Sequence, residues 1–303
     1  MFRTIFSAFF LSLFFLISAA QIFGITEGGQ IDYSFKPAGY FPPLGDNGAN
    51  LVVQPDGKIL TAGRFTPDTQ GTSAVKLVRF LPNGQIDPSF NPVFPVANIR
   101  ITTFMLQPDG KIIYSYQSRF PGNYEKVELV RIDTNGNIDP SFTFNFALEG
   151  TVFQLFTQPD GKILVVGDCR DKSEIPVRMD IIRLNTDGSF DQTFNIPNRP
   201  TNYVFPRISM YADGSFISRE SGIFSVPPFP PFFRKFDRDG NLLSVIQPNL
   251  PNDITQIGFI VQPDGKILVT GTLGFFPNST AFTLRLLADG SSDTQFQTAN
   301  VSG

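Results

Sequence analysis

The chain of 303 residues contains no histidine, no tryptophan and a single cysteine, Cys169. Without histidine it can form neither a Ser-His-Asp triad, nor a Cys-His pair, nor a zinc site with histidine ligands. The lone cysteine cannot form an internal disulfide, so stability has to come from packing, and we interpret Cys169 as an unreactive thiol. The lack of tryptophan weakens the case for a lectin that stacks sugars on indole rings. Phenylalanine, with 34 residues, supplies most of the aromatic side chains.

The chain also lacks an excess of either charge. Lysine and arginine number 24 and aspartate and glutamate number 27, which gives a net charge of −3. Such a balance provides no basic surface for nucleic acid or for anionic lipid. We therefore expect no nucleic-acid partner. We also expect no cofactor and a monomeric chain.

The N-terminus carries an apolar run over residues 5–17, which follows Arg3 and precedes the small residues 18–20. This order is typical of a secretory signal peptide that is cut after Ala20. The alternative, a transmembrane anchor, needs about 20 apolar residues, and this run is shorter. We predict a signal peptide over residues 1–20, one mature domain over 21–303 without a membrane span, and a location in the periplasm, at the cell surface or outside the cell.

An internal repeat is the most informative feature of the mature chain. The pentapeptide QPDGK occurs four times, and a degenerate copy, YADGS, lies between the third and the fourth. The glycines of this first turn recur every 51 to 53 residues, at Gly57, Gly110, Gly161, Gly214 and Gly265. The glycines of a second turn recur every 50 to 52 residues, at Gly84, Gly136, Gly188, Gly240 and Gly290. These two series define five repeat units, at about residues 36–90, 91–142, 143–194, 195–245 and 246–296.

Each turn lies between short apolar segments, such as LVV before Pro55-Asp56-Gly57 and KILTAG after it. Proline, aspartate and glycine suit the successive positions of a type I turn with a bulge, which closes a β-hairpin. Two hairpins make four strands, and four-stranded antiparallel units repeated about every 50 residues are typical of propeller blades. We predict an all-β propeller of five blades, or of six or more if the chain is a shortened array. Residues 28–35 copy the last strand of a unit and predict an extra strand that adds to, or displaces, that of the final unit.

The segments QPDGKIL and LVRFLPNGQIDPSF (residues 77–90), with their copies, resemble the delta-60 repeat family of bacterial exported proteins. The resemblance covers residues 26–297 and implies a propeller-forming module of a secreted or cell-surface protein. It implies no catalytic role and no cofactor. The fourth unit departs from the pattern, with YADGS at its first turn and LLSV at residues 242–245, so we expect an irregular blade there.

A basic residue lies four positions before the second-turn Asn or Asp in every unit, and an acid lies four positions after it in four units. The basic residues are Arg79, Arg131, Arg183, Lys235 and Arg285, and the acids are Asp87, Asp139, Asp191 and Asp293. A hairpin brings these positions opposite each other, so we predict an ion pair within each blade. A binding site used once would not be copied, and we interpret the pairs as structural. Leu243 takes the place of the acid in the fourth unit, so Lys235 should lack this partner.

Two second turns weakly resemble calcium loops, because oxygen-bearing side chains cluster around Asp133 and Asp139 and around Asp237 and Asp239. In a calcium loop of the EF-hand kind, glycine follows three alternating ligands and a bidentate acid comes later. Here glycine arrives one ligand early and no glutamate follows at the right distance. We therefore interpret both segments as turns without a metal.

The units differ most in the segments between their second and third strands and in the connections between units. In a propeller both kinds of loop emerge on the face opposite to the tight turns, and variable loops on a rigid scaffold often bind partners. If they are exposed, phenylalanines beside prolines in these loops would be apolar anchors, whereas folded back they would cap the blades. These candidate partner-binding residues are Phe224, Phe229, Phe232, Phe275 and Phe276.

Two functions fit a secreted propeller. The first is an interaction or scaffold module that binds a protein or glycan through the variable loops and is not an enzyme. The alternative is a hydrolase or lyase that works through carboxylates or calcium in the central channel, which requires acids on the innermost strands. The segments taken as innermost strands, residues 51–53, 103–106, 153–156 and 258–261, are almost entirely apolar. We therefore predict the binding module and no catalytic residues.

Overall fold

The computed structural model describes residues 25–26, 30–31, 51–65, 74–95, 99–118, 126–171, 179–194, 196, 207–220, 232–248, 250, 254–273 and 280–296. The predicted signal peptide and the candidate residues Phe224, Phe229, Phe275 and Phe276 lie outside these ranges. In the described part of the chain every regular element is a β-strand, and no helix is long and apolar enough to cross a membrane. The all-β class predicted from the repeat is confirmed.

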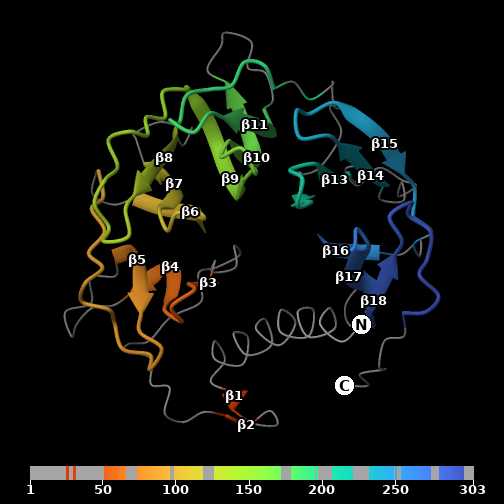
Figure 1. Cartoon of the computed structure of the whole chain (residues 1–303), viewed down its shortest axis with the longest axis horizontal. Coiled ribbons are helices and arrows are strands. Elements are labelled where there is room, and N and C mark those ends of the chain that lie inside the picture. The colour runs from red at the N-terminus through yellow and green to blue at the C-terminus, as the bar shows by residue number, and fades with distance from the viewer. Residues whose placement is uncertain are drawn as a thin grey trace, which may run out of the picture. The chain divides into compact units, whose positions relative to one another are not determined.

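The chain divides into two compact bodies, residues 1–143 and 144–303. In the first body, repeat 1 contains β3 (Leu51–Val53), β4 (Ile59–Phe65) and β5 (Ala74–Phe80), and repeat 2 contains β6 (Ile99–Leu106), β7 (Ile112–Ser118) and β8 (Lys126–Ile132) (Figure 1). The short strands β1 (Ile25–Thr26) and β2 (Gln30–Ile31) pair with each other. The part of the predicted extra strand that the structure describes, Gln30–Ile31, is therefore paired with the residues just before it.

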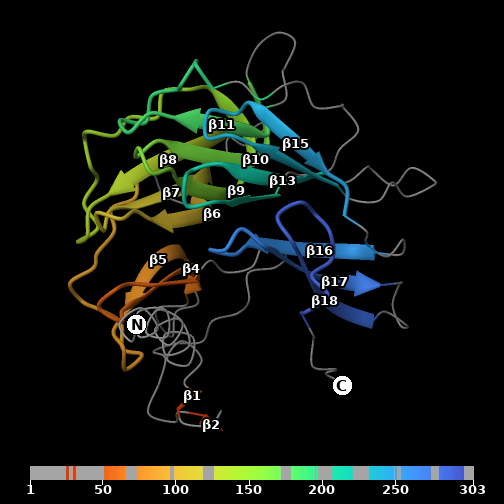
Figure 2. The same cartoon turned by 45° about the vertical axis from the view of Figure 1, so that its right-hand side comes forward.

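The second body contains three repeats. Repeat 3 has β9 (Leu148–Thr157), β10 (Ile163–Asp171) and β11 (Ile181–Leu184), which lie side by side in both views (Figures 1 and 2). Repeat 4 has β12 (Arg207–Met210), β13 (Phe216–Glu220), β14 (Phe232–Phe236) and β15 (Leu242–Ile246), and repeat 5 has β16 (Ile254–Val261), β17 (Ile267–Leu273) and β18 (Thr280–Leu286). Within each repeat, consecutive strands pair antiparallel.

The predicted fourth strand forms fully in repeat 4 alone among the described residues. In the other repeats it is reduced to one bridge, as between Phe80 and Ile86. The cause is the segment after the bridge, where Asp87 Oδ1 accepts the backbone N–H of Ser89 and Phe90 donates its N–H to the Asp87 carbonyl, which closes a turn. Repeat 4 has LLSV instead of this motif, so its chain continues as β15. The repeat expected to be irregular is thus the one with four regular strands.

The hairpin turns have the geometry that the sequence predicts. At the first turn of repeat 1, Gly57 donates its N–H to the Gln54 carbonyl at 2.9 Å, and Gln54 donates to the Lys58 carbonyl at 2.8 Å. Gly57 has a φ of 81°, which is unfavourable for residues with a Cβ atom. Aspartate serves the same turn, because Asp56 Oδ1 accepts the N–H of Lys58.

Apolar clusters join neighbouring repeats within each body. In the second body, Leu164 and Val166 of repeat 3 pack with Ile208 and Phe216 of repeat 4. On the other face of repeat 4, Ile217 packs with residues of repeat 5, among them Ile267 and Val269. Both faces of the sheet in repeat 4 are therefore covered, which explains why its strands are apolar at consecutive positions.

Each repeat has two ends, the turn end and the loop end. The turn end carries both glycine turns, after the first strand and after the third. The loop end carries the start of the first strand and the connection from the second strand to the third. In repeat 3, the loop end is where β9 begins at Leu148 and β10 ends at Asp171.

Candidate functional site

The recurrent charges at the turn end form the predicted ion pairs. The Arg Nε to Asp Oδ2 distances are 2.8, 2.9, 2.7 and 2.9 Å for Arg79–Asp87, Arg131–Asp139, Arg183–Asp191 and Arg285–Asp293. In repeat 3 both partners are buried, with 2% of the Arg183 side chain and 5% of the Asp191 side chain exposed. The structural interpretation of these charges is confirmed.

Two more residues of the repeat motif complete this clamp. The lysine of each QPDGK turn reaches the same carboxylate, as Lys162 does to Asp191 at 2.8 Å. The phenylalanine that ends the motif lies under the guanidinium, as Phe194 does at 4.8 Å from Arg183. The sequence interpretation did not assign these roles, although both residues recur with the clamp.

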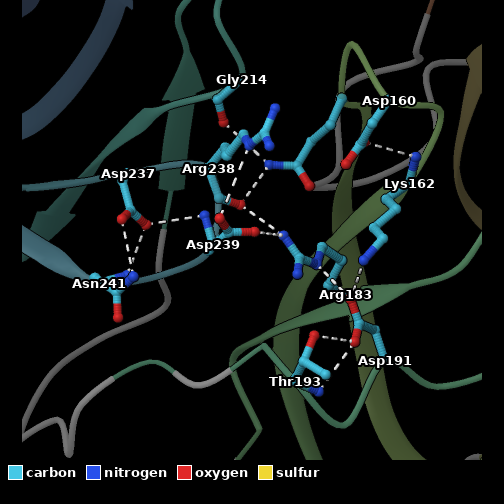
Figure 3. A network of polar contacts seen from close by, with 11 residues as sticks. Asp160, Lys162, Arg183, Asp191, Thr193, Gly214, Asp237, Arg238, Asp239 and Asn241 are labelled. Carbon is cyan, nitrogen blue, oxygen red and sulfur yellow. Dashed lines mark hydrogen bonds and ion pairs between the residues drawn. The ribbon is translucent and has the colours of Figure 1, made fainter.

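The same arginine also links one repeat to the next (Figure 3). Arg183 Nη1 donates to the Arg238 carbonyl at 2.8 Å and lies 2.9 Å from Asp239 Oδ1, both at the second turn of repeat 4. The glutamine of QPDGK converges on this point, because Gln158 Nε2 donates to the carbonyls of Gly214 and Arg238. Repeats 1 and 2 are linked likewise, by Arg79 Nη1 and the Thr134 carbonyl at 2.6 Å. Contacts at the turn end thus stabilise a repeat internally and also join it to the next repeat.

Acid should weaken the fold through these carboxylates. Hydrogen bonds from Lys111 and Ser141 hold the pKa of Asp139 well below its ordinary value of 3.8, and a bond from Lys266 lowers that of Asp293. A carboxyl whose pKa is depressed on folding adds stability above its unfolded pKa, and this is lost as pH falls. We expect the urea midpoint to be level between pH 7 and 5 and to fall steadily below about pH 4. A midpoint that stays level down to pH 2.5 would contradict this.

Repeat 4 departs from the clamp as predicted. Leu243 occupies the position of the acid, with 58% of its surface exposed. Lys235 instead lies over the ring of Tyr211 at 4.7 Å. Tyr211 replaces the glutamine of QPDGK, so the two substitutions in this repeat compensate each other.

The calcium-like segments are hydrogen-bonded turns. Asp133 Oδ1 accepts the backbone N–H groups of Asn135 and Asn137, and its Oδ2 accepts the side-chain amide of Asn137. Asp237 makes the same contacts with Asp239 and Asn241. Turn geometry accounts for these side chains, and we assign no function to the turn end.

At the loop end, the structure describes one of the five candidate phenylalanines. Phe232 is the first residue of β14, pairs with Glu220 on β13 and is half-buried. It is therefore part of the sheet and not of the preceding connection. The role predicted for these five residues stays a prediction.

The loop end of repeat 3 holds a group of polar residues on long first and second strands. The segment 153–156 is only the last part of β9, which begins at Leu148 and carries Glu149, Thr151 and Gln154. β10 likewise runs beyond Gly167 through Asp168 and Arg170. Glu149, Thr151 and Asp168 are all partly exposed.

The pairing of β9 and β10 is irregular at this point. Gly150 has a φ of 121°, and a Cβ atom there would lie 2.0 Å from the Asp168 carbonyl oxygen. Apart from the turn glycines, it is the one glycine with positive φ in the part of the chain described. The register also shifts between Val166 and Gly167. β-Bulges and unusual backbone angles of this kind are common beside functional sites.

The register brings two carboxylates to one face of repeat 3. Glu149 pairs with Arg170, and Thr151 pairs with Asp168, so Glu149 and Asp168 are diagonal neighbours. Diagonal positions of an antiparallel pair are roughly 7–8 Å apart. They lie on the face of Val166 and Gln154, because alternate residues of a strand share a face. That face is turned toward repeat 4, since Gln154 exchanges two hydrogen bonds with the backbone of Ile208.

Cys169 lies between these acids on the opposite face. It is buried and free, and its Sγ donates to the Thr151 carbonyl at 3.6 Å. Burial, together with the nearby charges of Asp168 and Asp180, raises the pKa of the Cys169 thiol to about 12. The thiol is therefore protonated at neutral pH, and we assign no chemistry to it.

Four stretches of the chain match a family model described as "Domain of unknown function (DUF5122) beta-propeller", at residues 54–90, 107–142, 158–194 and 262–296. The predicted propeller fold is confirmed by this match. The match supports a β-propeller repeat family, but it does not identify that family as the delta-60 repeats. The number of blades stays a prediction. No curated protein sequence matches the chain.

Solved structures of similar fold include carbohydrate-active propellers. The GH93 α-L-arabinofuranosidase of Fusarium graminearum is 14% identical with a TM-score of 0.50, covering 85% of this chain and 84% of its own. A PL25 ulvan lyase is 9% identical with a TM-score of 0.50, covering 86% and 76%. The GH74 xyloglucanase of Xanthomonas campestris is 14% identical with a TM-score of 0.46, covering 77% of this chain and 35% of its own. Identities this low show the fold alone.

The prediction that the chain is not an enzyme is corrected by these structures. The propellers that it resembles at a TM-score of 0.50 include a glycoside hydrolase and a polysaccharide lyase. The absence of histidine excluded only histidine-dependent chemistry, because glycoside hydrolysis uses a pair of carboxylic acids. The apolar segment 153–156 does not include the acids, because β9 begins five residues earlier, at Leu148.

Proposed function

We propose that this chain is an exported carbohydrate-active propeller that hydrolyses glycosidic bonds of a polysaccharide at the loop end of repeat 3. The observation that carries the proposal is the placement of Glu149 and Asp168 on one face of the β9–β10 pair. Both acids lie at the loop end of repeat 3, on the face turned toward repeat 4, so a polymer that binds at the loop end would meet them. The delta-60 resemblance, export and a monomeric state belong to the same proposal.

The separation of the two acids suits hydrolysis with inversion. Inverting enzymes place two carboxyl groups about 6.5–9.5 Å apart, which leaves room for water. One acid, protonated, gives its proton to the leaving glycosidic oxygen. The other, ionised, takes a proton from the water that attacks the anomeric carbon. The carbon–oxygen bond breaks as water supplies OH to the sugar and, through the two acids, H to the leaving group. The backbone positions of the two acids are diagonal neighbours, roughly 7–8 Å apart, and from there side chains of this length can span the required separation.

The proposal is tested by incubating the full chain with soluble polysaccharides, neutral and acidic, and assaying new reducing ends and unsaturated products separately. We expect new reducing ends without unsaturated products, because hydrolysis consumes water and elimination does not. Unsaturated products would show that the chain is a lyase and would overturn the proposed hydrolysis. Binding of a polymer with no cleavage on any substrate would favour the interaction module and overturn the proposal.

A further inference from the structure

The first strand of repeat 3 contains one residue more than the strand beside it. Gln154 pairs with Val166 and Val152 pairs with Gly167, so Phe153 is an extra residue in β9. This is a β-bulge, in which two residues of one strand oppose one residue of the other. Because side chains alternate between the two faces of a sheet, an extra residue exchanges the faces of all residues beyond it.

The bulge decides which face Glu149 occupies. Leu148 and Val152 are fully buried on the face of Cys169, whereas Glu149 is partly exposed on the face of Asp168. In a regular strand these faces would be exchanged, so the carboxylate would enter the apolar side and the two aliphatic side chains would leave it. The bulge is therefore what brings the two acids to one face.

Gly150 is the second unusual feature of β9, and it lies next to Glu149. A Cβ atom on Gly150 would lie 2.0 Å from the Asp168 carbonyl oxygen and 3.0 Å from Cys169 Cα. Both of these atoms belong to the backbone of β10, so a side chain fits only if the two strands move apart. Any such movement would also separate Glu149 from Asp168.

Repeat 2 shows that the scaffold does not require this glycine. A bulge lies at the corresponding place in its first strand, where the register shifts between Ile101 and Thr103. The position of Gly150 is taken there by Ile99, which pairs with Ser118 just as Gly150 pairs with Cys169 in repeat 3. The bulge thus recurs between repeats, whereas the glycine occurs beside the two carboxylates.

We propose that Gly150 is a positioning residue of the hydrolase, because it lets the backbones of β9 and β10 pack closely between Glu149 and Asp168 and so fixes the separation of the two acids. The inference rests on the proposed function, since this separation matters for catalysis only if the acids work as a pair. Hydrolysis with inversion needs room for one water molecule beside the sugar. A misplacement of about 1 Å can lower the rate of such a reaction about 100-fold.

Kinetics of the Gly150→Ala variant of the full chain test the inference. We expect kcat on the best polysaccharide to fall about 100-fold and KM to change less than about threefold, because the contacts that bind the sugar remain. In the Glu149→Gln background the same substitution should change the residual rate less than about threefold, since the pair is already broken. Equal losses in the two backgrounds would overturn the inference.

Gly258→Ala in repeat 5 is the matched control. A Cβ atom on Gly258 would meet the side-chain Oγ1 of Thr270 at 3.1 Å, and this contact lies away from the two acids. We expect a rate within about twofold of the wild type, as for other substitutions remote from the reacting groups. Gly150→Ala should keep the circular dichroism of the wild type, because repeat 2 has isoleucine at this position. A variant that fails to fold would show that Gly150 is structural and would also overturn the inference.

A second readout does not depend on turnover. In the double variant Glu149→Cys/Asp168→Cys, the two thiols should be bridged by dibromobimane, which becomes fluorescent when it joins two thiols. Cys169 does not compete for the reagent, because it is buried on the opposite face. Adding Gly150→Ala should slow the bridging about tenfold or more, because the strands move apart.

The two readouts separate the two proposals. Bridging at an unchanged rate with Gly150→Ala would overturn the positioning role, even if the wild-type chain hydrolyses polysaccharide. Bridging that depends on Gly150, in a chain that cleaves no polysaccharide, would support the positioning role and overturn the hydrolase.

Discussion

Replacing Asp191 with alanine should lower the free energy of unfolding by about 3–5 kcal/mol, because it leaves the buried Arg183 charge without its main partner. Only 2% of the Arg183 side chain is exposed. Asp239 remains 2.9 Å from Arg183 Nη1, so we expect the lower end of that range. The loss would appear as a lower urea midpoint, followed by circular dichroism.

The repeat itself supplies the control for this change. Leu243→Ala alters the same repeat position in repeat 4, where the clamp is missing and the side chain is 58% exposed. An exposed site of this kind should change stability by no more than about 0.5 kcal/mol. Equal losses for Asp191→Ala and Leu243→Ala would show that the clamp does not stabilise the fold.

Glu149→Gln and Asp168→Asn should each reduce polysaccharide hydrolysis by about 10²–10⁴-fold, the usual contribution of a general acid or base. Each substitution preserves the shape of the side chain and removes its ability to exchange a proton. The urea midpoint of each variant should stay close to that of the wild type, which separates lost chemistry from lost folding. The measurement is the initial rate of reducing-end release on the best substrate.

Asp171→Asn is the matched control for these acids. Asp171 lies on the same strand as Asp168 but pairs with Leu148, on the opposite face of the sheet. Its variant should retain the wild-type rate within about twofold, since alternate faces of a strand are separated by the sheet. Wild-type rates in both Glu149→Gln and Asp168→Asn would place the reaction elsewhere.

The turn end could be predicted from the sequence because its contacts are local and repeated. Arg183 and Asp191 are eight residues apart across one hairpin, and four copies of the spacing confirm one another. The reach of Arg183 to the Arg238 carbonyl could not be predicted, because it depends on how one repeat packs on the next. The prediction of a fourth strand in every repeat was wrong for a local reason. Asp87 and Ser89 close a turn where that strand was expected.

The loop end was missed because strand length is hard to infer from an interrupted pattern. Glycine within a strand usually weakens it, so LEGT before residues 153–156 did not indicate a continuation of β9. The structure accommodates Gly150 at a positive φ and extends β9 to ten residues, which adds Glu149 to the sheet. A useful signal was the variation at this repeat position, where the five units have Arg64, Gln117, Asp168, Ser221 and Thr272.

The most direct test of the site is a crystal structure of the Glu149→Gln variant of the full chain with an oligosaccharide of the preferred polymer. We expect a sugar at the loop end of repeat 3, with a glycosidic oxygen or a water molecule within hydrogen-bond distance of Asp168. A sugar bound at the turn end, among Lys162, Asp191 and the neighbouring turns, would contradict it.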